Sequence, residues 1–216
     1  MPDYGRKQDR YIPAFSYGSL TTFYDLIMRL TMREFTFKRR LVDQARITKG
    51  ERVLDLGCGT ATLAILIKES HPEAEVIGLD GDPKVLEIAR AGLDITLDRG
   101  IAFELPYPDS SFDRVLSSLL FHHLTRENKR HTLGEVFRVL RHGGEFHLAD
   151  FGKPSNVLMY LTSLVMRHFE ENRDNIDGLM PKFIKEAGFN RVEEVTRYMM
   201  MIGTISLYRA LKPLNG

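Results

Sequence analysis

Short apolar runs alternate with amphipathic stretches between residues 51 and 151. The apolar runs have the length of buried strands, whereas the stretches between them repeat their apolar residues at helical spacing. Alternating strands and helices predict an α/β fold with a largely parallel sheet and helices on both of its faces. The expected strands are residues 51–59, 74–80, 95–100, 112–120 and 143–151, and the expected helices are residues 61–70, 82–90 and 127–140.

The two ends of the chain follow other patterns. Residues 191–200 and 203–211 have the pattern of two strands joined around Gly203, which predicts an antiparallel hairpin at the edge of a seven-stranded sheet. Residues 155–187 have a mainly helical pattern. Residues 19–46 also repeat apolar and aromatic positions at helical spacing, so they must bury that face somewhere.

Two placements of this N-terminal segment are open. We expect residues 1–48 to form a helical lid over the carboxyl ends of the strands, where ligands bind in open α/β sheets. Residues 49–216 would then form the ligand-binding domain, within one globular unit. The rival placement is on the back of the sheet, where the segment would only stabilise the fold.

A glycine turn carries the clearest candidate chemistry. Gly57 and Gly59 follow the first strand and let the backbone turn sharply beside a ligand. Asp55 lies two residues before this turn, where it can hold an ammonium group directly or through water. Asp80 ends the second strand, where a carboxylate can accept two hydrogen bonds from a ribose diol. The dinucleotide pattern GxGxxG needs a third glycine where this chain has Thr62, so the turn favours S-adenosylmethionine (SAM) over a nicotinamide dinucleotide.

Four ordered motifs resemble those of the class I SAM-dependent methyltransferases: VLDLGCGTATLA, VIGLDGDP, GIAFELPYPDSSFDRVLSSLLFHHL and EVFRVLRHGGEFHLADF. Together they cover about residues 50–152. The flanks resemble the ubiquinone/menaquinone biosynthesis methyltransferase-like group through FYDLIMRLTMREFTFKRRLV, IKEAGF and GTISLYRALKP. The resemblance implies a Rossmann-like fold and an enzyme that methylates a small-molecule acceptor, apolar or quinone-like, and leaves S-adenosyl-L-homocysteine.

The resemblance also implies which residues hold SAM. Asp55 and the glycine turn should line its methionine half, and Asp80 should bind its ribose. The residues after Asp80 should follow the ribose and adenine, and those at the end of the fourth strand should border the methyl group. The expected cofactor-binding set is Asp55, Gly57, Cys58, Gly59, Asp80, Gly81, Asp82, Ala102, Phe103, Ser117 and Ser118.

The chain departs from the family pattern at several positions. Ala61 stands where glycine is frequent, and Ile101 replaces the acidic residue that meets the adenine amino group. His142 replaces the proline of the motif PGG. Ala61 and Ile101 leave room for an alternative in another class, a non-catalytic SAM-binding or regulatory protein with the same fold.

Methyl transfer from a sulfonium is an in-line displacement, so the protein must chiefly align the reactants and exclude water. A base is needed only where the acceptor must lose a proton. His122 and His123 follow the fourth strand, and either one is a candidate base or both only pack within the loop. Asp150 ends the fifth strand and is either a site residue or a helix cap. The candidate acceptor contacts are Tyr17, Tyr24 and Asp150, and the sequence shows no convincing metal-ligand spacing.

Composition and charge limit the location and the partners. Charged residues make up 27% of the chain, and the net charge of +1 gives no argument for a nucleic-acid partner. Residues 1–50 carry ten Lys/Arg against five Asp/Glu, which fits either a solvated helix face or a surface for anionic substrates or lipid headgroups. The single cysteine suits a reducing cytosol, and no run reaches the roughly 18 apolar residues of a membrane span. We therefore expect a cytoplasmic protein, with peripheral membrane contact and oligomeric state left open.

Overall fold

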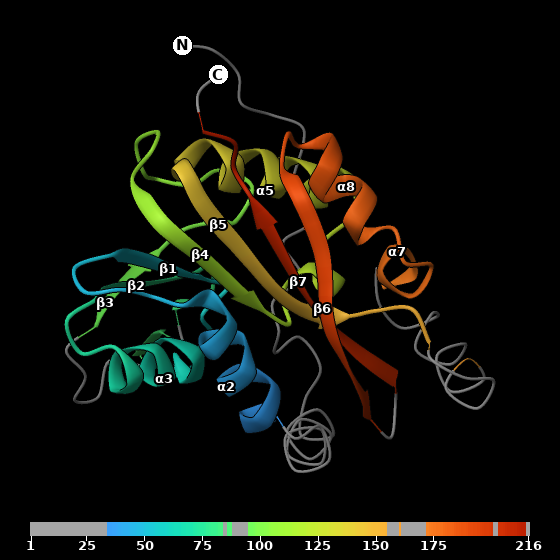
Figure 1. Ribbon diagram of the computed structural model, residues 1–216, viewed down its shortest axis with the longest axis horizontal. Helices are drawn as coiled ribbons and strands as arrows, with labels where there is room; N and C mark the ends of the chain where they lie inside the picture. The colour runs from blue at the N-terminus through green and yellow to red at the C-terminus, as the bar shows by residue number, and fades with distance from the viewer. Residues whose placement is uncertain are drawn as a thin grey trace.

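Seven strands form one sheet within the part of the chain that the computed structural model describes, which is residues 34–83, 86–87, 95–154, 160, 172–200 and 203–214 (Figure 1). The strand order is β3-β2-β1-β4-β5-β7-β6. Strands β1 to β5 are parallel, and β7 pairs antiparallel with both β5 and β6. The expected sheet and its antiparallel edge hairpin are thereby confirmed. The strands are β1 (Arg52–Leu56), β2 (Glu75–Asp80), β3 (Thr96–Arg99), β4 (Phe112–Ser118), β5 (Leu140–Phe151), β6 (Asn190–Met200) and β7 (Gly203–Leu211).

Helices cover both faces of this sheet. Figure 1 shows α2 and α3 on one side, with α5 and α8 on the other. A short 3-10 helix, η1, follows β4 and precedes α5. The helices are α2 (Glu34–Ala45), α3 (Thr62–Ser70), η1 (Phe121–His123), α5 (Arg126–Val139), α7 (Arg173–Ile176) and α8 (Met180–Glu186).

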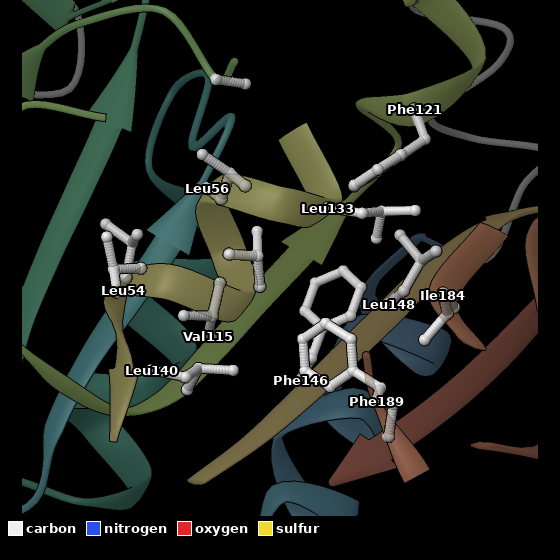
Figure 2. Close-up of a cluster of buried hydrophobic side chains, with 14 of the residues drawn as sticks. Leu54, Leu56, Val115, Phe121, Leu133, Leu140, Phe146, Leu148, Ile184 and Phe189 are labelled. Atoms are coloured by element: carbon white, nitrogen blue, oxygen red, sulfur yellow. The ribbon is translucent and has the colours of Figure 1, made fainter. Parts of the chain in front are cut away.

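Strand β1 supplies side chains to both halves of the core. Val53 packs on the side of α2 and α3, whereas Leu54 and Leu56 pack on the side of α5, because successive side chains of a strand point to opposite faces. Figure 2 shows this second half, in which Phe146 and Phe189 lie with their ring centroids 5.9 Å apart. Burial on both faces explains why the strands have continuous apolar sequences.

Helix α2 is the described part of the expected lid, and it packs on a face of the sheet. Phe37, Leu41, Val42 and Ala45 are buried in the core that α2 shares with α3, β4 and β5. These four residues cover a face of the sheet, while the placement of the whole segment is not decided by α2 alone. Within α2, Glu34 and Lys38 of the first two turns line the cavity at the carboxyl ends of the strands. Residues 1–33 lie outside the described part of the chain, so a lid formed by them stays a prediction.

The junction between α5 and β5 differs from the sequence expectation. Helix α5 ends at Val139 and β5 begins at Leu140, because Leu140 already pairs with Phe112 of β4. Lys212 Nζ donates hydrogen bonds to the carbonyls of Phe137 and Leu140, both at 2.7 Å. The buried ammonium therefore satisfies carbonyls that the end of a helix leaves without partners.

Two expected helical stretches are described only in part. Of residues 82–90, the hydrogen bond from Leu86 N to Asp82 O, at 3.3 Å, fits the start of a helix. Of residues 155–187, the structure describes residue 160 and residues 172–187, which include α7 and α8. None of the described helices is both long and apolar enough to cross a membrane.

Candidate active site

A cavity of about 240 Å³ opens at the carboxyl ends of β1, β2 and β4. Ligands of open parallel sheets bind at this edge, because loops diverge there and leave a crevice. Its walls are formed by the first two turns of α2, by the loops after the three strands and by the start of α5. The lining consists of Glu34, Lys38, Asn128 and residues 57–60, 79–81, 100–103, 118–120 and 123–125.

The glycine turn after β1 forms one wall of this cavity. Gly57 has a φ of +73°, and an added Cβ would meet Leu120 side-chain atoms at 3.0 Å. Gly59 has a φ of +55°, and an added Cβ would meet nothing within 4 Å. Both residues thus use a backbone conformation that glycine adopts most readily, and the space beside Gly59 is open to a ligand.

Asp80 joins the end of β2 to the glycine turn. Its Oδ2 accepts a hydrogen bond from Gly59 N, and its Oδ1 accepts one from Asp82 N, both at 2.9 Å. These two bonds fix the carboxylate at the cavity wall. Because each carboxylate oxygen has about two acceptor positions, Asp80 can still receive a hydrogen bond on each oxygen from a ribose diol.

Asp55 lies behind the glycine turn and does not line the cavity. It is 1% exposed, and its Oδ2 accepts a hydrogen bond from Ala64 N near the start of α3, at 2.9 Å. Burial raises the pKa of Asp55 to about 7, although Lys38 and the Ala64 N–H act in the opposite direction. Its other oxygen, Oδ1, is buried and has no hydrogen-bond partner among the described residues, so a contact of Asp55 with the ammonium of a ligand stays a prediction.

The other expected SAM contacts divide into two groups. Cys58, Gly81, Ala102, Phe103 and Ser118 line the cavity, as do Gly57, Gly59 and Asp80. Asp82 and Ser117 do not line it, and Ser117 Oγ instead donates to Leu56 O within the sheet. Burial raises the pKa of the Cys58 thiol, which suits a packing residue rather than a nucleophile.

Three observations indicate that the cavity can hold the adenosyl donor. The space beside Gly59 is open, and Asp80 keeps acceptor positions toward it. Ser118 Oγ is buried and has no hydrogen-bond partner among the described residues. Each of these features presents either space or an unused polar atom to a ligand at the end of β1, β2 or β4.

The histidine pair belongs to η1, which follows β4. Asp150 Oδ1 and His122 Nδ1 are 2.9 Å apart, and Asp150 Oδ2 accepts a hydrogen bond from Phe121 N at the start of η1. Asp150 is fully buried and therefore acts as a cap and a partner of His122, without lining the cavity. Burial would raise the pKa of Asp150, but His122 and the backbone N–H groups outweigh it, so the pKa is lowered.

His123 is the member of the pair that lines the cavity. Its ring centroid lies 3.9 Å from that of His122, which is 5% exposed. The charge of His122 lowers the pKa of His123, since two stacked imidazoles disfavour a second proton. His147, in contrast, is completely buried between Gln44 and Glu145 and takes no part in the cavity.

Two charged residues of the cavity were not among the sequence candidates. Glu34 and Lys38, in the first turns of α2, form an ion pair of 2.5 Å and both line the cavity. Their spacing of four residues is the signal in the sequence, but many exposed helices carry such pairs. The candidates Tyr17 and Tyr24 lie outside the described residues. Among those described, no three His, Cys, Asp or Glu side chains form a group that could hold a metal ion.

Comparison with known proteins gives consistent matches. The family described as "Methyltransferase domain" matches residues 53–144. A demethylmenaquinone methyltransferase from Deinococcus radiodurans is 30% identical over 97% of this chain and 92% of its own length. One from Thermus thermophilus is 37% identical over 64% of this chain and 65% of its own length.

Solved structures agree on the fold. A SAM-dependent methyltransferase from Methanosarcina mazei superposes with a TM-score of 0.65, covering 81% of this chain and 98% of its own. At 18% sequence identity this similarity shows the fold alone.

Proposed function

Because this chain belongs to the class I SAM-dependent methyltransferases, in the ubiquinone/menaquinone biosynthesis group, we propose that its acceptor is a reduced quinone or a similar apolar ring. The methyl donor is SAM, which supplies a methyl group already activated on a sulfonium. The observation that carries the proposal is one cavity whose lining combines two kinds of residue. The glycine turn and Asp80 are suited to the donor, whereas leucines and His123 are suited to an apolar acceptor.

The glycine turn and Asp80 suit the donor. Asp80 would hold the ribose, and Gly59 leaves room for the chain that bears the sulfonium. Ala102 and Phe103 would flank the adenine, with Ile101 beside them in place of an acidic residue. Ser118, at the end of β4, would lie between the donor and the acceptor.

The leucines and His123 of the lining suit an acceptor that is largely apolar and carries a hydroxyl group. Leu119, Leu120 and Leu124 offer apolar surface, and a reduced quinone presents flat apolar rings. His123 presents an imidazole whose pKa is lowered by His122, so it is neutral and can accept a hydrogen bond from an acceptor hydroxyl. We infer that His123 contacts the acceptor, while His122 and Asp150 hold His123 in place.

The names of the relatives support the acceptor class. Two are called demethylmenaquinone methyltransferase, and one from Pseudomonas fluorescens is called a ubiquinone/menaquinone biosynthesis C-methyltransferase. By analogy, the atom methylated here is a ring carbon. A cytoplasmic location, peripheral contact with a membrane that holds the acceptor, and the absence of a nucleic-acid partner belong to the same proposal.

The test is an acceptor screen with SAM that carries a labelled methyl group. The panel holds reduced naphthoquinones and benzoquinones lacking one ring methyl, with a catechol and a primary amine as controls. We expect label in the quinols and not in the controls. Label only in the controls would overturn the acceptor class, whereas binding of SAM without transfer to any acceptor would favour a non-catalytic SAM-binding protein.

A further inference from the structure

The short helix α7 contacts the carboxylate that orients the histidine pair. Asn175 Nδ2 donates a hydrogen bond to Asp150 Oδ1, at 3.2 Å. Both side chains are completely buried, so water does not compete for this bond. None of the described residues that line the cavity belongs to α7. Any effect of Asn175 on the reaction would therefore pass through Asp150 rather than through contact with a ligand.

Asp150 receives hydrogen bonds on both of its oxygens. Its Oδ1 accepts from Phe151 N, at 2.7 Å, as well as from Asn175, and it lies 2.9 Å from His122 Nδ1. Its Oδ2 accepts from Phe121 N, at 2.7 Å. Because the pKa of Asp150 is lowered, this carboxyl group is ionised and only accepts hydrogen bonds. His122 Nδ1 therefore carries a proton, and its bond to Asp150 fixes the orientation of the ring.

The ring of His122 is packed against two neighbours. Its centroid lies 3.9 Å from that of His123 and 4.9 Å from that of Phe151. Buried groups at this density cannot move independently. A shift of the Asp150 carboxylate is therefore transmitted through His122 to His123, which is the histidine that lines the cavity.

Helix α7 depends on contacts with other elements for its position, since four residues are too few for a stable isolated helix. Asp174, next to Asn175 in the chain, accepts a hydrogen bond from Arg126 Nε of α5, at 3.0 Å. The Asp174 carboxylate also lies 3.7 Å from the buried ammonium of Lys129, on the same helix. These contacts tie α7 to α5 while the adjacent Asn175 bonds Asp150.

The chemistry of asparagine suits this position. Its amide donates a hydrogen bond to Asp150 without adding a charge, whereas an aspartate there would repel the carboxylate and a leucine would leave it one donor short.

We propose that Asn175 is a positioning residue for methyl transfer. Through Asp150 and His122 it holds the His123 ring in the place and the neutral form that accept a hydrogen bond from the acceptor hydroxyl. This inference rests on the proposed function, since it takes a hydroxyl of the acceptor as the partner of His123.

A histidine titration tests the proposal without an acceptor. The pH dependence of the histidine ring signals would be followed by nuclear magnetic resonance in the full chain, in Asn175→Asp and in Asn172→Asp. Asn172 is the matched control, because it is the same residue type, stands at the start of α7 and is equally buried, but its amide atoms have no partner among the described residues.

The other charged groups around the histidine pair are the same in all these variants, so the comparison isolates position 175. They are Asp150 on β5, Asp174 on α7, Arg126 and Lys129 on α5, and Glu34, Lys38 and Asp80 in the cavity lining.

The wild-type His123 should show no titration above about pH 5, because its pKa is lowered to about 3 by the charge of His122 and by burial. Asn175→Asp should bring this titration above about pH 5. If the new carboxyl group ionises, its charge favours a second proton on the histidine pair. If it shares a proton with Asp150, the hold on the His122 cation weakens and the repulsion felt by His123 falls. Asn172→Asp should leave His123 as in the wild type.

A kinetic comparison uses variants that add no charge. Asn175→Leu keeps a similar volume but loses the donor, so kcat with a reduced naphthoquinone that lacks one ring methyl should fall roughly tenfold. The acceptor KM and the affinity for S-adenosyl-L-homocysteine should change by less than about threefold. Asn172→Leu should keep the wild-type kcat.

Two results would overturn the inference. One is an Asn175→Asp chain whose His123 titrates as in Asn172→Asp, and the other is the same kcat for Asn175→Leu and Asn172→Leu. If Asn175→Asp fails to fold by circular dichroism, Asn175→Leu decides through kcat. If the wild type methylates none of the quinols, the proposed function fails, whereas the histidine titrations still decide on Asn175 because they need no acceptor.

Discussion

His122 and His123 stack with their ring centroids 3.9 Å apart, yet only His123 lines the cavity. His122 is instead directed to the buried carboxylate of Asp150, 2.9 Å away. Adjacent residues of one short helix thus have different surroundings, one facing the ligand space and the other facing a buried partner. The two histidines should therefore respond differently to substitution.

Replacing His123 by Ala should slow turnover far more than it weakens donor binding. The side chain contacts the acceptor in our proposal, so we expect kcat to fall by roughly a hundredfold while S-adenosyl-L-homocysteine affinity changes by less than about threefold. Replacing His122 by Ala should instead lower the melting temperature, because it removes a buried ring and one of the hydrogen-bond partners of the buried Asp150 carboxylate. A His123→Ala enzyme with wild-type kcat would remove this residue from the mechanism.

Replacing Asp80 by Asn should weaken SAM binding by roughly ten- to a few hundredfold, as expected for losing charge-assisted hydrogen bonds. The amide keeps the shape of the side chain, but one of its two polar atoms no longer accepts a hydrogen bond. Asp98→Asn is the control, since Asp98 lies on the adjacent strand and does not line the cavity. An unchanged dissociation constant for Asp80→Asn, measured by calorimetry, would refute the ribose assignment.

Asp55 should make stability depend on pH around neutrality. Its pKa is raised from an ordinary value of 3.8 to about 7, chiefly by burial, so the folded chain holds a proton that the unfolded chain releases between these values. The unfolding free energy contributed by this group therefore decreases as the pH rises through this window, and the loss is complete above it.

Replacing Asp55 by Asn removes this dependence. Relative to the wild type, the variant should gain stability as the pH rises from about 4 to 8, by on the order of 4 kcal/mol. Urea unfolding at several pH values measures the difference between the two proteins, which cancels the titration of other groups. A difference that does not change with pH would contradict the raised pKa.

Replacing Ala61 by glycine should change the free energy of unfolding very little. It has a φ of +60° at the N-cap of α3, a left-handed conformation in which a Cβ costs roughly 1–2 kcal/mol. Removing the methyl group loses buried apolar surface, worth about 0.8 kcal/mol, so Ala61→Gly should be close to neutral. Ala45→Gly, at a buried position of α2, should cost at least about 1 kcal/mol. If Ala61→Gly and Ala45→Gly lost the same unfolding free energy, measured by urea unfolding, the backbone strain at Ala61 would be contradicted.

Much of the fold follows from the order of residues along the chain. Strand β1, the turn at Gly57 and helix α3 are adjacent in sequence, and Asp80 ends the next strand, so local patterns were sufficient to predict that they meet. Parallel strands then bring these residues to one edge of the sheet.

The position of α2 and the pair on it could not be predicted in this way. Helical spacing shows that Phe37 and Leu41 share a buried face, but it does not say which surface covers them. Lys38 and Gly57 are far apart in the sequence. The packing of α2 beside α3 places both of them at the cavity. Contacts between elements distant in sequence depend on packing, which periodicity does not encode. The same limit applies to Asp55, whose burial behind the turn depends on α3 and Ala64.

In the proposed reaction this cavity binds SAM and an apolar quinol, and a ring carbon of the quinol receives the methyl group. The most direct measurement uses SAM with a deuterated methyl group, a reduced naphthoquinone lacking one ring methyl, and mass spectrometry of the products. We predict a quinol that carries the intact deuterated methyl group on a ring carbon, formed in equal amounts with S-adenosyl-L-homocysteine and absent with Asp80→Asn. A wild-type chain that binds SAM but forms no methylated quinol under these conditions would contradict the account.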